Sequence, residues 1–182
     1  MSVEQPSVRA RVLAEVTKAY DRRVMNNVHR SEYVEAILAV ALADYGWYRK
    51  DAWDQWDFEH ASGVRLEVKQ SAAAQQWELP GSKKRSSPRF DIAPRTGYYQ
   101  GDVFVERPGR NADVYVFAWN AGTEEEAADQ REPSNWDFHV IAERRLPPQQ
   151  SIGLGPLQRL VAPCGFDELG TVVERVRNTL GS

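Results

Sequence analysis

The chain is poor in the residues that build covalent cross-links and soft-metal sites. Cys164 is its one cysteine, and three histidines occur among its 182 residues. A single thiol forms no internal disulfide and supports no cysteine-based zinc cluster. Because nothing near Cys164 in the sequence would activate it, the thiol is predicted to be buried rather than catalytic.

Long apolar runs are also missing. The longest, residues 36–43, falls far short of the roughly 20 residues that a membrane-spanning helix requires. The first residues lack the basic, apolar and small-residue order of a secretion signal. Residues 153–155 read Gly-Leu-Gly, without the third glycine and preceding strand of a nucleotide-binding loop, and predict a turn before a helix. A cytoplasmic protein with no membrane association and no organic cofactor is therefore expected.

An excess of positive charge is absent too. The formal net charge is -3 and the pI is about 5.7, so the chain does not coat nucleic acid by overall charge. Any polyanion must meet a local patch, and residues 83–95 offer one, although a solvated loop is the simpler alternative. Aromatic residues suited to stacking on an exposed base, Phe90, Tyr98 and Tyr99, lie in or beside it. The basic residues predicted to contact DNA are Lys83, Lys84, Arg85, Arg89 and Arg95.

Apolar periodicity predicts the organisation of the chain. Spacings of three and four predict a short arm or packing helix over 8–20, a second helix over 34–45 and a third over 166–180. Between the helices, alternation predicts a hairpin over 56–70 around Ser62-Gly63, and a continuous apolar run predicts a buried strand over 112–119. A neighbouring strand is predicted over 136–142, and residues 78–112 predict an excursion from the sheet.

We therefore predict a single α/β domain over 1–182. An N-terminal helical arm covers 1–24, and a core over 25–180 holds a mixed central β-sheet flanked by helices.

Charged residues capable of chemistry gather at the predicted hairpin. Asp57 precedes the turn, and Glu67 and Lys69 follow it on one face, because strand side chains alternate with a period of two. Carboxylate oxygens hold Mg²⁺ against a phosphate, and a lysine alongside positions the attacking water. The pattern predicts phosphodiester hydrolysis with Mg²⁺, for which Mn²⁺ would substitute. Glu35, on the second helix, would reach this site directly or through water.

Simpler interpretations of these residues stay open. Glu-x-Lys is common by chance, and a solvated strand face with a cross-strand charge pair accounts for it. Asp54 is a rival for Asp57, which lies closer to the turn, and Glu35 would complement a helix dipole. The histidines are most simply structural, although His29 and Arg30, just before the second helix, are candidates for contact with a phosphate.

The order of these residues resembles that of a known superfamily. Asp57, then Glu67-Val68-Lys69 on the next strand, after a helix bearing Glu35, resembles the PD-(D/E)XK, or restriction-endonuclease-like, nucleases. Blocks such as NNVHRSEYVEAILAVAL, ADVYVFAWN and REPSNWDFHVIAERRLP are similar to a family of largely uncharacterised bacterial proteins within it. The resemblance spans about residues 25–175. One departure is Trp56, which stands where the superfamily's name has a proline, a position that varies widely.

The resemblance implies a restriction-endonuclease-like core and a role for each matching residue. Asp57, Glu67 and the backbone carbonyl of Val68 become the metal ligands. Lys69 becomes the residue that positions the attacking water, and Gln70 a neighbour that orients the site or contacts the phosphate. Glu35 becomes the carboxylate contributed by the helix.

The activity that this resemblance implies is that of a Mg²⁺-dependent DNA endonuclease, which would suit defence against foreign DNA. Cutting both strands of a duplex favours a two-fold homodimer, because each chain carries one site. Two alternatives are a catalytically silent nuclease-fold module, acting by binding or as a subunit of a larger complex, and a nuclease directed at RNA.

Overall fold

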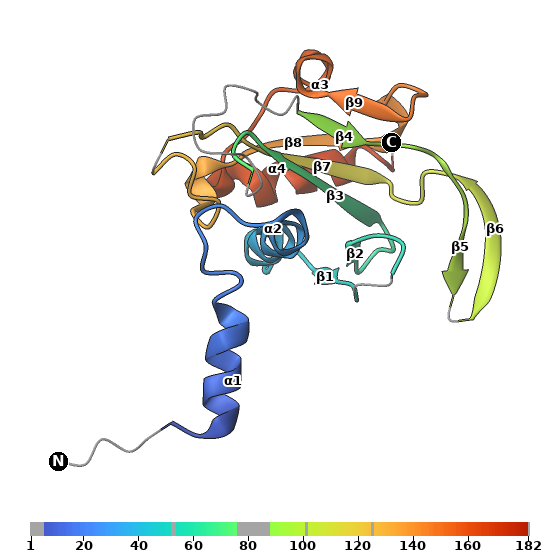
Figure 1. Ribbon diagram of the computed structural model, residues 1–182. Coiled ribbons are helices and arrows are strands. Elements are labelled where there is room, and N and C mark those ends of the chain that lie inside the picture. The colour runs from blue at the N-terminus through green and yellow to red at the C-terminus, as the bar shows by residue number, and fades with distance from the viewer. Residues whose placement is uncertain (1–5, 52–53, 76–87, 101, 125, 182) are drawn as a thin grey trace.

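The computed structural model describes residues 6–51, 54–75, 88–100, 102–124 and 126–181. At its centre is a five-stranded sheet of order β1-β2-β3-β7-β8 (Figure 1). The first three strands are antiparallel neighbours, β7 runs parallel to β3, and β8 runs antiparallel to β7. The strands are β1 (Trp47–Arg49), β2 (Phe58–His60), β3 (Arg65–Ala72), β7 (Val114–Asn120) and β8 (Asp137–Ala142). The predicted mixed α/β architecture is confirmed.

The predicted hairpin joins β2 to β3. Its turn places Gly63 at a φ of 83°, a left-handed conformation that glycine adopts without a steric penalty. β2 is short: its register with β3 pairs Phe58 with Leu66 and Glu59 with Arg65 and goes no further. From Val68 onward, the edge of β3 on the side of β2, opposite β7, therefore has no strand beside it in the described part of the chain.

Two helices cover one face of the sheet. α2 (Asn27–Ala41) starts where the Asn26 side chain accepts a hydrogen bond from the N–H of His29, and α4 (Phe166–Asn178) packs beside it. A β-carbon on Gly170 of α4 would lie 2.5 Å from the Ala41 carbonyl oxygen, so only glycine allows this approach. The helices enclose a core whose members include Val34, Leu38, Leu66, Val116, Phe138, Leu169 and Val173.

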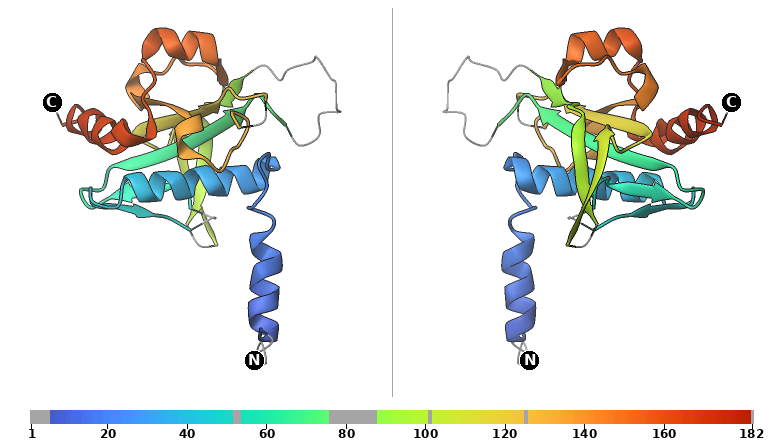
Figure 2. Two further views of the ribbon diagram at one scale, coloured as in Figure 1. Left: turned by 90° about the vertical axis from the view of Figure 1, so that its left-hand side faces the viewer. Right: turned by 90° about the vertical axis from the view of Figure 1, so that its right-hand side faces the viewer.

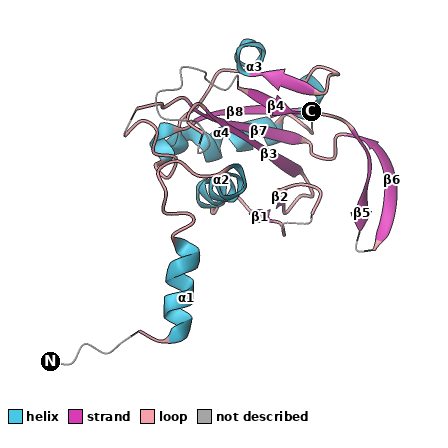
Figure 3. Ribbon diagram, viewed as in Figure 1, coloured by secondary structure: helices cyan, strands magenta, loops and turns pink. Residues whose placement is uncertain are grey.

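The opposite face is covered by smaller elements. β4 (Arg89–Asp91) pairs with β9 (Ser151–Gly153), and α3 (Leu154–Leu160) follows directly (Figure 3). Phe90 is 2% exposed, and the centroid of its ring lies 5.1 Å from that of Phe117. The prediction that Phe90 stacks on a base is therefore wrong: it faces the sheet and is part of the core. Short 3₁₀ turns, Pro133–Asn135 and Glu143–Arg145, flank β8.

Two elements project from this body. α1 (Val8–Thr17) extends away from it and has no buried residue (Figure 2). The sequence predicted either an arm or a packing helix here, and the structure shows an arm. β5 (Arg95–Gln100) and β6 (Val103–Gly109) form a two-stranded ribbon, the excursion expected between the central strands. Cys164 is buried, as predicted. None of the helices within the described residues combines the length and apolarity needed to cross a membrane.

Candidate active site at the open edge of β3

Asp57 directly precedes β2 and lies beside the part of β3 that β2 leaves unpaired. Its backbone N–H donates to the carbonyl of Leu66, and its carboxylate accepts a hydrogen bond from the N–H of Val68 at 2.6 Å. The N–H and C=O of one strand residue point to the same side. The carbonyl of Val68 therefore faces the same edge as the Asp57 carboxylate.

The electrostatics of Asp57 show that other carboxylates lie close by. The pKa of Asp57 is raised to about 7: burial is the largest cause, and the negative charges of Glu67 and Glu35 add to it, against the lowering effect of the Val68 N–H and Lys69. Three of the other predicted catalytic residues, Glu35, Glu67 and Lys69, thus act on Asp57.

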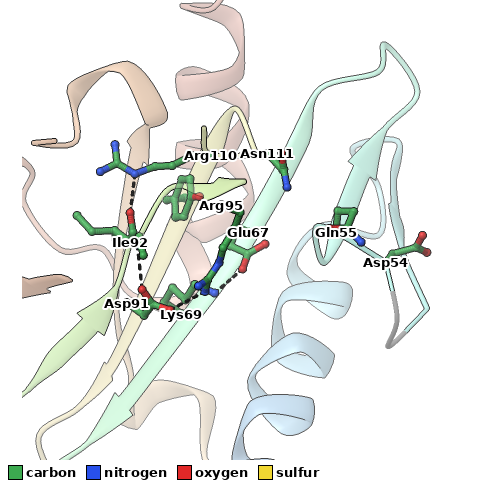
Figure 4. A pocket seen from close by; sticks show the side chains of 11 residues that line it. Asp54, Gln55, Glu67, Lys69, Asp91, Ile92, Arg95, Arg110 and Asn111 are labelled. Atoms are coloured by element: carbon green, nitrogen blue, oxygen red, sulfur yellow. Dashed lines mark hydrogen bonds and ion pairs between the residues drawn. The ribbon is translucent and has the colours of Figure 1, made fainter. Parts of the chain in front are cut away.

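Glu67 and Lys69 lie on the face of β3 that carries α3, and the ammonium of Lys69 forms an ion pair with Glu67. Both side chains are only partly exposed, at 18% and 26%. They line a cavity of about 140 Å³ that also receives residues from β4, β5 and the start of β7 (Figure 4). The pair therefore has open space beside it into which a ligand can enter.

Glu35 approaches from α2 but is turned toward another partner. Its carboxylate is 2.8 Å from Nη2 of Arg49 on β1, which makes an ion pair across the edge of the sheet. Within the described residues, no three His, Cys, Asp or Glu side chains are grouped so as to hold a metal ion. Glu35 therefore acts on Asp57 through its charge rather than as a third carboxylate ligand.

The remaining donor set suits one class of metal. Asp57, Glu67 and the carbonyl of Val68 supply hard oxygen atoms at one edge. Mg²⁺ is commonly held by one or two carboxylates, with water and substrate phosphate completing its shell. The residues present therefore fit Mg²⁺ or Mn²⁺, and they do not fit a metal that prefers sulfur or imidazole.

Gln70 lies on the other face of β3 from Lys69. Its carboxamide accepts from Nε of Arg30 at 2.6 Å and donates to Oδ1 of Asn27 at 2.9 Å, so it anchors the start of α2. Arg30 is 2% exposed and also donates to Gln75. A guanidinium so enclosed does not reach a phosphate, and the structure corrects the DNA contact predicted for Arg30. Its role is to hold α2 and β3 together.

The other predicted DNA contacts differ in placement. His29 is half-buried, with its ring 4.9 Å from that of Tyr20 and its Nδ1 bonded to Asn26. Arg89 is exposed on β4, and Arg95 lines the cavity while paired with Asp91 at 2.6 Å. Lys83, Lys84 and Arg85 lie outside the described residues.

Several cavity residues escaped the sequence analysis, among them Gln55, Ile92, Arg110, Asn111 and Tyr115. Tyr115 and Asn111 line the cavity from β7 and the segment before it, and Arg110 closes its wall. Tyr115 faces this side because it pairs with Glu67 in the parallel register of β3 and β7. Its apolar strand suggested only a core position, and no spacing or motif marks Arg110 or Asn111.

No protein-family model matches the chain, and no curated protein shows significant sequence similarity to it.

Proposed function

We propose that the chain is a Mg²⁺-dependent nuclease with a restriction-endonuclease-like fold that hydrolyses phosphodiester bonds in DNA. One observation carries the proposal: Asp57, which directly precedes β2, accepts a hydrogen bond from the N–H of Val68 on β3, so its carboxylate lies near Glu67, whose charge helps to raise the pKa of Asp57. Lys69 contacts Glu67, and a cavity opens beside the pair. Two acids, a cation and an open space are the parts that such chemistry requires.

The two carboxylates and the Val68 carbonyl would hold Mg²⁺, which supplies Lewis-acid stabilisation of charge on the phosphoryl oxygens. Lys69 is placed to donate a hydrogen bond to a water molecule once Glu67 is engaged elsewhere. Its positive charge favours partial ionisation of that water. The water oxygen bonds to phosphorus as the in-line bond to the sugar oxygen breaks, and solvent returns a proton to the leaving oxygen.

The substrate would approach from the side of β4 and β5. Arg89 is exposed on β4, and Arg95 lines the cavity, where a phosphate would compete with Asp91 for its guanidinium; both would pair with phosphates that flank the scissile one. With one site in each chain, a two-fold homodimer would allow both strands of a duplex to be cut. A cytoplasmic role in defence against foreign DNA accords with this activity.

A nicking assay tests the proposal. Supercoiled plasmid is incubated with the protein in Mg²⁺, in Mn²⁺ and in EDTA, and relaxed and linear products are quantified. We expect cleavage with either metal, none in EDTA, and a loss of at least about 100-fold in Lys69→Ala. Lys18→Ala is the matched control, because Lys18 also pairs with a glutamate, Glu15, but lies on the exposed arm.

The outcomes separate the alternatives. Cleavage that persists unchanged in Lys69→Ala would remove the mechanism, and DNA binding without cleavage under any metal would leave a nuclease-fold binding module. Parallel digestion of single- and double-stranded DNA and RNA of one sequence decides the substrate, since a preference for RNA would point to recognition of the 2′-OH.

A further inference from the structure

The projecting arm carries an apolar stripe that the rest of the described chain leaves uncovered. Val8, Val12, Leu13 and Val16 of α1 are 73%, 58%, 63% and 56% exposed. Spacings of three and four place these side chains on one face of the helix. Single exposed apolar residues are ordinary, but a continuous apolar stripe marks an interaction surface.

The base of the arm is fixed to the body, so the stripe is presented in a set direction. Tyr20 donates a hydrogen bond to Glu32 of α2, and the Arg131 guanidinium pairs with the carboxylate of Asp21. The helix beyond this base has 10 residues, and helices of this length are only marginally stable alone in water. Packing of its apolar face on a partner would therefore stabilise α1.

α2 carries a second uncovered apolar surface. Val28 and Val40 are 65% and 68% exposed, and Ala36 between them is exposed as well. Helical spacing places these three residues on the side of α2 opposite the buried Val34 and Leu38. α1 and α2 run in different directions from the loop that joins them and form a corner (Figure 2). The arm therefore leaves this outer face of its own α2 uncovered.

The charges beside the two surfaces are of opposite sign. The charged side chains of the arm are three basic and one acidic: Arg9, Arg11, Lys18 and Glu15. On α2 and just after it, the exposed charged side chains are acidic, Glu32 and Asp44. Two arms packed together would bring like charges together, whereas an arm packed on α2 brings opposite charges together.

We propose that the apolar stripe of α1 packs on the outer face of α2 in a second copy of this chain, and that the arm of the second copy packs on α2 of the first. A two-fold axis that bisects the corner exchanges the directions of α1 and α2, so both contacts form at once. The paired helices run antiparallel, so Val12 lies toward Ala36 of the partner subunit. The basic first half of each arm then lies near the carboxyl end of the partner's α2, where a helix dipole favours positive charge.

The dimensions of the helices suit this exchange. α1 is about 15 Å long and α2 about 22 Å, so the arm fits along its partner. A stable interface buries roughly 800 Å² on each partner, and one pair of helices this short buries less. The exchange doubles the buried area, because each chain contributes its arm to one contact and its α2 face to the other.

Sedimentation velocity of the full chain, at about 1 to 200 µM, tests the assignment. We expect a monomer–dimer equilibrium with a Kd on the order of 10 µM for the wild-type protein. Val12→Glu on the arm and Val40→Glu on α2 should each weaken it at least about 30-fold, because the new charge is buried at both symmetric contacts. Val103→Glu is the control, since Val103 on β6 is 60% exposed and lies outside both surfaces. Circular dichroism should show that all three variants fold, because each replaced side chain is exposed.

Cysteine cross-linking identifies which helices meet. Val12→Cys and Ala36→Cys proteins are prepared separately, mixed and treated with a short bismaleimide, while the native Cys164 is buried. We expect a cross-linked dimer in the mixture and little in either protein alone. A cross-link formed by Val12→Cys alone would show that the arms pair with each other and would overturn the assignment to α2.

Other results would overturn the inference as well. They are a monomer at every concentration, or a dimer that either Val12→Glu or Val40→Glu leaves unchanged. Apolar helices with basic flanks also bind membrane surfaces, so wild type and Val12→Glu are sedimented with vesicles of phosphatidylcholine and phosphatidylserine. We expect neither to bind, and binding that Val12→Glu abolishes would assign the stripe to a membrane instead. None of these measurements needs catalysis, so their outcome is independent of the proposed nuclease activity.

Discussion

Replacing Asp57 by asparagine should stabilise the metal-free protein, although it removes a predicted metal ligand. Burial beside Glu67 raises the pKa of Asp57 from 3.8 to about 7 in the folded state. As pH rises from about 4 to 7, the unfolded chain loses this proton while the folded chain keeps it, so stability falls over that window. Above pH 7 Asp57 is ionised in both the folded and the unfolded chain, and the folded state bears the full free-energy cost of burying its charge.

The cost follows from the size of this shift. Three units at about 1.4 kcal/mol each give about 4 kcal/mol, and solvent that reaches the half-buried carboxylate lowers this to about 2–4 kcal/mol. In Asp57→Asn an oxygen remains to accept from the Val68 N–H, while the charge that opposes Glu67 and Glu35 is gone. The free energy of unfolding should therefore rise by about 2–4 kcal/mol at pH 8 and hardly at all at pH 4.

Urea titration of both proteins in EDTA at pH 4 and pH 8 measures this difference. Asp54→Asn is the control, since the Asp54 side chain is 40% exposed and should give little change at either pH. An Asp57→Asn variant that is less stable at pH 8, or whose stability changes equally at both pH values, would show that the pKa of Asp57 is not raised in the folded state.

Three further predictions concern the metal, a buried network and a helix contact. Mg²⁺ at about 100 times its Kd should stabilise the wild-type protein by about 2.7 kcal/mol in thermal melts at pH 8. The stability of Glu67→Gln should not change on addition of Mg²⁺. Equal stabilisation of both proteins would show that Glu67 is not a ligand of the metal. Arg30→Met should lower the free energy of unfolding by about 2–4 kcal/mol, because Gln70 and other acceptors lose their hydrogen-bond donor. A change below about 0.5 kcal/mol in urea titration would show that Arg30 does not hold α2 and β3 together. Gly170→Ala should lower the free energy of unfolding by about 1–3 kcal/mol in the same titration, because the new methyl group would meet the Ala41 carbonyl oxygen. Gly165→Ala should lower it much less, because there is open space around Gly165. Equal effects would contradict the close approach of α2 and α4.

Much of the fold follows from local patterns. The apolar run before Asn120 predicts a buried strand because only a strand covered on both faces can bury every residue, and all of β7 is buried. Ser62-Gly63 predicts the turn between β2 and β3 because it supplies a residue tolerant of positive φ. Short elements such as β4 and β9 carry too few residues for a period to show, and they form because each finds a partner distant in the sequence.

In the candidate site, too, some residues follow from local patterns and others depend on contacts between distant segments. Alternation along one strand requires Glu67 and Lys69 to share a face, and the hairpin requires Asp57 to lie near them. Burial of Arg30 was not predictable, because the acceptors that enclose it come from residues about forty positions away. Tyr115 joins the cavity through the parallel register of β3 and β7, which no local pattern encodes. Periodicity along one segment determines which side chains share a face, whereas the contacts between distant segments decide which of those faces meet and what is left open between them.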